Sequence, residues 1–399
     1  MNLFRSQRSV SAIIAKAIAI AFASLLPVST GVFAQDTSAP PSAEPGSRFV
    51  DLVDLKPLAT VAVQNDGRVK SLSSLAQEVM SFISGPRDIN GQDPLFTYLD
   101  MLFRPDVYRE ADVIYVKGAG PRKRISDALL ASAPEDKRAS LQASMNVFAK
   151  TGLISEINIL DKEVVKVLRE MREDLIRTEK VVRAIDSALT AKDPRFLLSK
   201  LKIVPRGDGN ANAEWHGIAE LMFSDGQEPV PGSMLLLAEN KGQPADVRPE
   251  QAAVIGDAWR ALVSGWLRGD AAAVNAAAAT LGDELPKVDP ANYPDRERLA
   301  WEHWYFENDH MTRVWLVYMA ASVFLLLGFV WKWPKARAIG FVIFAIALVL
   351  HTMAVMLRWY IADRWPNSNM FEAVTTAAWM GALCAVVIEW WVRRTAMYS

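Results

Sequence analysis

The residues best suited to chemistry lie in one polar stretch near the C-terminal end of the chain. His351 lies inside an uncharged run, and Arg358 and Arg364 follow it. An ionisable ring in an apolar helix costs free energy unless it is paired or ligates a metal. Neutral imidazole is a common axial ligand of haem iron, and a guanidinium can bind a propionate through two hydrogen bonds. One interpretation is therefore a haem site. The other is a histidine hydrogen-bonded to a neighbouring helix, with arginines that mark the membrane surface.

Aromatic residues accompany these groups. Trp359, Tyr360, Trp365 and Phe371 lie in or beside the same stretch. Flat rings of this kind can stack against an apolar macrocycle. Their positions are consistent with a cofactor wall at the outer end of the helices.

The helices that would position this stretch are predicted from three uncharged segments, 314–331, 338–357 and 373–388. We expect membrane spans at about 314–331, 338–357 and 371–390, within a transmembrane region from 311 to 399. About 17 to 20 apolar residues are enough to cross the hydrocarbon core of a bilayer. The fold is expected to end in three transmembrane helices.

Basic residues predict the orientation of these spans. They cluster after the first span and after the third: Lys332, Lys335, Arg337, Arg393 and Arg394. Cytoplasmic loops carry such an excess of Lys and Arg. Residues 36–312 and the loop 358–370 are therefore expected on the outer side of the membrane.

The N-terminal end has the pattern of an export signal. Basic residues precede an apolar run from Ala17 to Val28, and a small-residue cleavage site ends at Ala34. We predict a signal peptide over 1–34, or alternatively an uncleaved anchor, because the uncharged length is close to the spanning minimum. Residues 35–48 are rich in proline and are predicted to be a flexible linker.

The region 49–310 is predicted to be a mostly helical exported domain. Apolar residues from Asp161 to Leu189 alternate in steps of three and four, which predicts a long helix packed within the domain. Three β-prone stretches, 59–64, 113–116 and 233–237, predict a small mixed α/β element. The fold class is therefore mainly α, with this small element and the three spans.

A turn and a helix start are also predicted in this domain. An Asn-Asp-Gly sequence at 65–67 follows a short apolar strand and favours a turn. Ser71 or Ser73 is then expected to cap a helix.

Composition excludes several classes of function. The net charge is −1, which argues against a nucleic-acid partner. The single cysteine, Cys384, excludes an internal disulfide framework, a Cys-rich zinc site and an iron–sulfur cluster. No Gly-x-Ser-x-Gly or His-Glu-x-x-His sequence is present, so hydrolase chemistry of those kinds is disfavoured.

Two segments resemble a known family. The first, 351–372, is His-Thr-x4-Leu-Arg-x-Tyr-Ile-x5-Asn-Ser-Asn-Met-Phe-Glu, and the second, 63–78, is Val-Gln-x-x-Gly-Arg-Val-Lys-x-Leu-x-x-Leu-Ala-x-Glu. The first closely resembles the second-to-third-span segment of CcsA/ResC-type cytochrome c biogenesis proteins. The second is similar to the exported domain that precedes this part in the fused, CcsBA-like form. Residues 114–116 and 293–305 show weaker similarity to that domain.

The resemblance implies system II cytochrome c maturation, in which haem reaches the outer face of the bacterial inner membrane and is attached to apocytochrome c. It implies haem b as the cofactor and His351 as a ligand of its iron, within the lipid bilayer. Combined with the residues above, it gives a cofactor-binding set of His351, Arg358, Trp359, Arg364, Trp365, Pro366, Asn367, Ser368, Asn369, Phe371 and Glu372. The implied partners are a CcsA/ResC-like protein, a ResB/CcsB-like protein and apocytochrome c. Membership of a haem lyase complex is a further implication.

The sequence departs from the family pattern in several places. Phe371 stands where the family has Tyr, and Ala373 where it has Ser; the tryptophan-rich WWD signature has no counterpart. The resemblance therefore implies either a partner that carries the WWD segment and further spans, or a truncated chain. The remaining histidines, His216, His303 and His310, lie outside the spans. His303 and His310 are near enough to the outer surface to be considered as a second axial ligand, although a solvated pair beside the membrane is favoured. His216, beside Trp215, is expected to have a structural role. An alternative function is a scaffold that docks apocytochrome or assembly partners without binding haem, and a weaker one is a tethered receptor for a small ligand.

Overall fold

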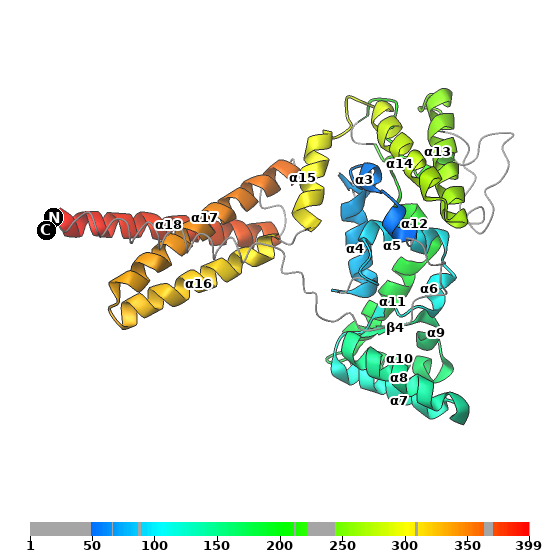
Figure 1. The fold of residues 1–399 in the computed structure, drawn as a ribbon, viewed down its shortest axis with the longest axis horizontal. Helices are drawn as coiled ribbons and strands as arrows, with labels where there is room; N and C mark the ends of the chain where they lie inside the picture. The colour runs from blue at the N-terminus through cyan, green and yellow to red at the C-terminus, as the bar shows by residue number, and fades with distance from the viewer. Residues whose placement is uncertain are drawn as a thin grey trace. The chain divides into compact units, whose positions relative to one another are not determined.

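The computed structural model describes residues 49–398 except 66, 87–88, 211–212, 222–243, 308–309 and 363–369. The predicted signal peptide and linker, the β-prone stretch 233–237 and the site residues Arg364, Trp365, Pro366, Asn367, Ser368 and Asn369 lie outside these residues. The described chain is mainly α-helical, as predicted (Figure 1). Contacts divide it into two units, here called the N-terminal unit (up to His303) and the C-terminal unit (from Trp304).

The N-terminal unit consists mostly of short and medium helices. They are α2 (Phe49–Leu52), α3 (Lys56–Ala59), α4 (Leu72–Ser84), α5 (Pro94–Phe103), α6 (Val107–Glu110), α7 (Ala119–Ser132), α8 (Glu135–Thr151), α9 (Glu156–Ile159), α10 (Lys162–Glu173), α11 (Glu179–Lys192), α12 (Pro194–Lys200), η1 (Ile218–Leu221), α13 (Pro249–Arg268), α14 (Ala271–Glu284), η3 (Leu285–Lys287) and the first part of α15 (Arg296–Glu307). Figure 1 shows α13 and α14 side by side.

Two small antiparallel sheets complete this unit. In the first, β1 (Ala62–Asn65) pairs with β2 (Arg68–Ser71), so that Ala62 lies opposite Ser71. The predicted turn joins them, and Gly67 has a φ of +73°, which glycine adopts without strain. The second sheet pairs β3 (Ile114–Tyr115) with β4 (Leu153–Ile154).

Capping side chains begin the helices that follow. Ser71 is the N-cap of α4, and its hydroxyl accepts a hydrogen bond of 3.3 Å from the Ser74 N–H, as the sequence predicts. Asp93 caps α5 in the same way, and its carboxylate accepts a hydrogen bond of 2.8 Å from the N–H of Leu95. Pro94 occupies the first turn of α5, where its missing N–H is harmless.

The prediction of one long helix from Asp161 to Leu189 is wrong. The chain forms α10 and α11 with a break between them, because the Asp174 side chain accepts from the N–H groups of Ile176 and Arg177 at 3.3 and 3.1 Å. Such an Asx turn competes with helical hydrogen bonding. Leu175, counted in the apolar stripe, is 73% exposed at this break.

Aromatic side chains fill the centre of the N-terminal unit. Trp266 of α13 is 1% exposed, and its ring lies 4.9 Å from Phe96 and 5.6 Å from Phe103 between centroids. Trp259, two turns earlier on the same face of α13, contacts Phe103 edge-on at 5.7 Å. This packing joins α5 to α13, which are far apart in the sequence, into one core.

A glycine substitution tests the end of α8. Gly152 ends this helix at a φ of +81°, and a Cβ there would meet the Arg122 guanidinium and come within 2.8 Å of Tyr115. Arg122 is held in place by the carbonyl groups of Val116 and Ala149, at 2.7 and 3.1 Å. We expect Gly152→Ala to cost about 1–3 kcal/mol, because left-handed backbone and a close contact both oppose a side chain.

The measurement is amide hydrogen exchange of β4 and the last turn of α8 in the full-length protein. Gly120→Ala is the control, since Gly120 lies in α7 and a Cβ there meets nothing within 4 Å. Equal protection in the two variants would contradict the expectation.

The C-terminal unit contains three long helices, α16 (His310–Val330), α17 (Pro334–Ala362) and α18 (Met370–Tyr398), drawn from yellow to red in Figure 1. Each is long and apolar enough to cross a membrane, over 313–330, 334–361 and 370–392, which confirms the three predicted transmembrane helices.

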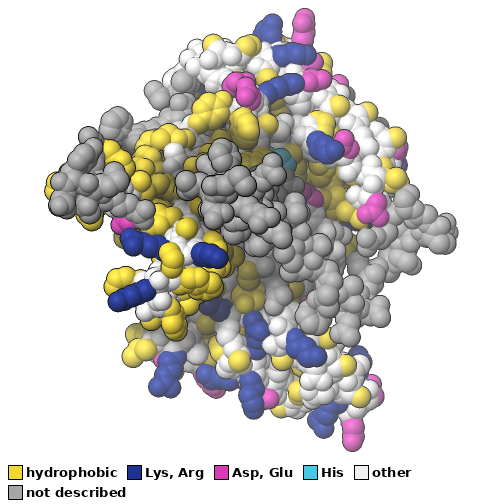
Figure 2. Space-filling view, turned by 60° about the vertical axis from the view of Figure 1, so that its left-hand side comes forward, with side chains coloured by type: hydrophobic (Ala, Val, Ile, Leu, Met, Phe, Trp, Pro, Cys, Tyr) yellow, Lys and Arg dark blue, Asp and Glu magenta, His cyan; other side chains and the backbone are white. Residues whose placement is uncertain are grey.

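Glycines allow α16 and α17 to approach closely. A Cβ on Gly328 would come within 2.7 Å of Arg337, and one on Gly340 within 2.8 Å of Leu325. Small residues at such crossings are typical of helix pairs in membranes. By contrast, apolar side chains remain exposed along α18, and broad hydrophobic areas are visible on the face shown in Figure 2.

Candidate functional site

His351 lies among all three helices of the C-terminal unit. Its side chain is on α17 and the residue is 6% exposed. Nδ1 is 3.3 Å from the Tyr318 hydroxyl of α16, and the two rings meet edge-on at 5.7 Å. The ring also lies beside the backbone of Thr375 on α18. These are the contacts with neighbouring spans that the second interpretation of His351 describes.

Arg358 lies two turns farther along α17, on the same face as His351, because seven residues make almost two full turns. Its Nη2 is 3.4 Å from the Glu372 carboxylate at the beginning of α18. The guanidinium carbon lies 5.1 Å from the centre of the Phe371 ring and 5.9 Å from that of Tyr305. Three residues of the predicted site, Arg358, Phe371 and Glu372, are therefore brought together.

This guanidinium is incompletely satisfied. The Tyr305 hydroxyl also forms a hydrogen bond with it. Nε of Arg358, however, is buried and has no hydrogen-bond partner among the described residues. Buried N–H groups are rarely left without an acceptor, so an orphan here indicates a place for one.

The predicted aromatic residues are arranged differently from one another. Trp359 meets Trp379 of α18 edge-on at 6.0 Å, and Trp379 donates from Nε1 to Thr352 at 2.9 Å. Tyr360 is 48% exposed and Phe371 is 55% exposed. Trp359 therefore joins helices, whereas the other two face outward.

Sequence reasoning missed four residues that hold this region: Tyr305, Tyr318, Thr352 and Trp379. The available signal was polarity inside a span, since Tyr318 and Thr352 carry hydroxyl groups in apolar helices. A hydroxyl in such a position needs a partner.

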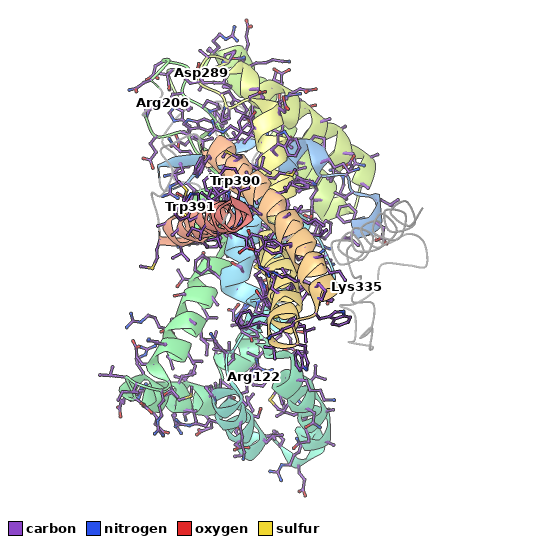
Figure 3. The ribbon with its side chains drawn as sticks, turned by 90° about the vertical axis from the view of Figure 1, so that its left-hand side faces the viewer. Arg122, Arg206, Asp289, Lys335, Trp390 and Trp391 are labelled. Atoms are coloured by element: carbon purple, nitrogen blue, oxygen red, sulfur yellow. The ribbon has the colours of Figure 1, made fainter. Side chains whose placement is uncertain are left out.

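A second ion pair joins α17 and α18 at their other ends. Arg337 donates to Glu389 at 3.1 Å. Figure 3 labels Lys335 at the beginning of α17 and Trp390 and Trp391 on α18, near this pair in sequence. The two helices are thus connected by one arginine–glutamate pair near each end.

In the N-terminal unit, the β1–β2 hairpin contacts Trp215 and Tyr293. The Tyr293 hydroxyl accepts a hydrogen bond of 2.8 Å from the N–H of Ala62 in β1. Its ring stacks on that of Trp215, with 5.8 Å between the ring centroids. The side-chain oxygen of Gln64 accepts a hydrogen bond of 2.7 Å from the N–H of Trp215. The β1–β2 hairpin is therefore a platform for the chain that leads to α15.

Two side chains of α15 reach the beginning of α4. Glu302 is 8% exposed, and its carboxylate accepts a hydrogen bond of 3.0 Å from the N–H of Ser71. Nδ1 of His303 lies 2.7 Å from the Ser73 hydroxyl. Burial raises the pKa of Glu302 to about 7, although the hydrogen bond from Ser71 and the charge of Lys70 act to lower it. Glu302 is thus a buried titratable group that fixes α15 to the helix start.

The remaining histidines have other surroundings. His216 lies between two carboxylates, with Nδ1 3.0 Å from Glu220 and Nε2 2.9 Å from Asp246, which supports the structural role favoured from the sequence. His303 is engaged by Ser73, and the His310 side chain lies outside what the structure describes. Within the described residues, no group of three or more His, Cys, Asp or Glu side chains is arranged to hold a metal ion.

Comparison with known proteins adds no assignment. No protein-family model matches the chain, and no curated protein matches it.

Proposed function

We propose that this chain is a membrane subunit of a system II cytochrome c maturation complex, which delivers haem to the outer face of the membrane. The observation that carries the proposal is His351, an imidazole buried in an apolar span, on the same helix face as Arg358 with its orphan Nε. These groups fit haem: the imidazole suits the iron, and the guanidinium suits a propionate. When bound, haem would itself be the group that is attached to apocytochrome c.

The roles of the chain's own residues follow from their contacts. His351 is proposed to hold the iron, with Tyr318 and the α18 backbone orienting the ring. A hydrogen-bonded neighbour fixes the orientation of a ligating imidazole. Arg358 is proposed to hold a carboxylate at the outer end of α17, where Phe371 offers an exposed ring.

A partner is proposed to complete the site. His351 is the one histidine in the three spans, and bis-histidine ligation needs a second imidazole. The proposed partner is a CcsA/ResC-like protein with the WWD segment, acting with a ResB/CcsB-like protein. In this proposal the complex lies in the bacterial inner membrane with residues 49–310 outside, which the clusters of basic residues after the first and third spans support.

We expect the purified full-length chain, expressed with its genomic neighbour, to show a haem Soret band that His351→Ala abolishes. The reason is loss of the imidazole ligand. The measurement is an absorption spectrum of each protein, alone and coexpressed. Met353→Ala is the matched control, because Met353 lies on the same helix and is 64% exposed. A band that never forms, or that survives in His351→Ala, would contradict the ligand assignment.

A second candidate is a scaffold that docks apocytochrome or assembly partners. It is favoured by the contacts of His351 with Tyr318 and Thr375, which give the ring partners without a metal. Here His351→Ala leaves a polar gap among the helices but no spectral change. The same spectra therefore separate the two functions.

A further inference from the structure

The two arginine–glutamate pairs between α17 and α18 differ in their surroundings. At one end, the side chains of Arg337 and Glu389 are 56% and 32% exposed, and they meet at 3.1 Å. At the other, those of Arg358 and Glu372 are 23% and 4% exposed, and they meet at the longer distance of 3.4 Å. The more buried pair is therefore the looser one. Burial normally demands better geometry from an ion pair, so this looseness calls for an explanation.

The contacts of Arg358 show what is missing. Its five N–H groups can serve a planar acceptor with two oxygens, through Nε and one terminal nitrogen together. Glu372 meets only a terminal nitrogen, and Nε has no partner among the described residues. The rings of Tyr305 and Phe371 lie beside the guanidinium and leave an apolar setting around it. A carboxylate carried on a flat apolar ligand would satisfy both nitrogens.

Glu372 has a stable place without Arg358. It lies in the first turn of α18, where the positive end of the helix dipole favours a carboxylate. Releasing Arg358 therefore does not leave Glu372 without electrostatic support. The pair can open while both helices remain formed.

We propose that Glu372 is an internal competitor, which occupies Arg358 until a carboxylate of the arriving ligand replaces it. This inference rests on the proposed function, because haem is the flat apolar ligand with carboxylates in question. It assigns Glu372 a role in setting affinity rather than in contacting the ligand. The exchange is a change of ion-pair partner and involves no covalent step.

The experiment uses zinc protoporphyrin and its dimethyl ester, titrated into the full-length protein in detergent and followed by porphyrin fluorescence. In Glu372→Gln, Arg358 loses its charged competitor, and we expect about tenfold tighter binding of the free acid, the effect of roughly one charge-assisted hydrogen bond. The ester, which has no carboxylate, should bind wild type and variant equally. Arg358→Gln should reduce the affinity for the free acid to that for the ester.

Glu389→Gln is the matched control, since it removes the carboxylate of the equivalent pair at the other end of the same helices. We expect it to leave both affinities unchanged. An equal gain in Glu389→Gln would assign the effect to loosened helices and overturn the competitor role. Equal affinities of wild type and Glu372→Gln for the free acid, with binding that His351→Ala weakens, would overturn the competitor and leave the proposed function standing. No saturable binding by any form, purified alone or together with its genomic neighbour, would overturn both.

Discussion

Asp100→Ala is expected to destabilise the N-terminal unit by about 2–6 kcal/mol, because two buried hydrogen-bond donors lose their acceptor. Asp100 of α5 is 3% exposed. Its Oδ1 accepts from Trp266 Nε1 at 2.7 Å and from Arg104 Nε at 2.6 Å, and its Oδ2 accepts from the Tyr108 hydroxyl at 2.7 Å. One carboxylate thus joins α5, α6 and α13.

The magnitude follows from what truncation leaves behind. Trp266 and Tyr108 are 1% and 5% exposed, so water does not replace the lost acceptor. An unsatisfied buried donor costs about 1–3 kcal/mol, and two remain. The arginine is less affected because its side chain is 39% exposed and can turn to solvent. Burial and the Asp100 charge together raise the pKa of Tyr108, so its hydroxyl stays protonated and needs an acceptor.

The measurement is native-state hydrogen exchange of α5 and α13 in the full-length protein in detergent. Asp100→Asn should lose less stability than Asp100→Ala, because the amide oxygen of asparagine can still accept a hydrogen bond. Asp186→Ala is the control: Asp186 is on α11 of the same unit, its side chain and that of its partner Arg172 are 50% and 60% exposed, and exposed pairs contribute about 0–1 kcal/mol. If Asp100→Ala and Asp186→Ala cost the same, the Asp100 cluster is not a stabilising centre.

Local patterns predicted much of this fold because they act within a few residues. The three spans follow from uninterrupted apolar length, and the start of α4 follows from Ser71 beside Ser74. The break between α10 and α11 was missed, since apolar spacing continues through Asp174 while its side chain ends the helix. Periodicity measures which residues share a face, and a single Asx turn overrides it.

Long-range contacts could not be predicted in this way. Asp100 and Trp266 are 166 positions apart, and nothing in either neighbourhood indicates the other. In the candidate site, polarity inside a span identified His351, but its partners come from separate helices whose packing the sequence does not specify. Arg358 was predicted to bind a ligand carboxylate, and the structure instead pairs it with Glu372, a residue of the same predicted site.

The second large effect concerns pH. Burial raises the pKa of Glu302 from 4.5 to about 7, so the folded state binds a proton more tightly than the unfolded chain does. The associated stability is fully present below about pH 4.5 and is lost as pH rises through about 7. At roughly 1.4 kcal/mol per pH unit, the loss is about 3 kcal/mol. We expect exchange protection at the α15–α4 contact, corrected for intrinsic exchange rates, to fall over this range.

Glu302→Gln should abolish this pH dependence. The amide oxygen still accepts from the Ser71 N–H, and the side chain is neutral at every pH, so no desolvated charge forms. Above pH 7 the variant should therefore be more protected than wild type, and below pH 5 the two should agree. Glu297→Gln, an exposed change on the same helix, should retain the wild-type slope. A slope that persists in Glu302→Gln would assign the titration to another group. If the slope is abolished in Glu302→Gln, the protonation of this one carboxylate controls how firmly α15 is held to the start of α4. In the chain, α15 is the helix that comes before α16, the first of the three apolar helices.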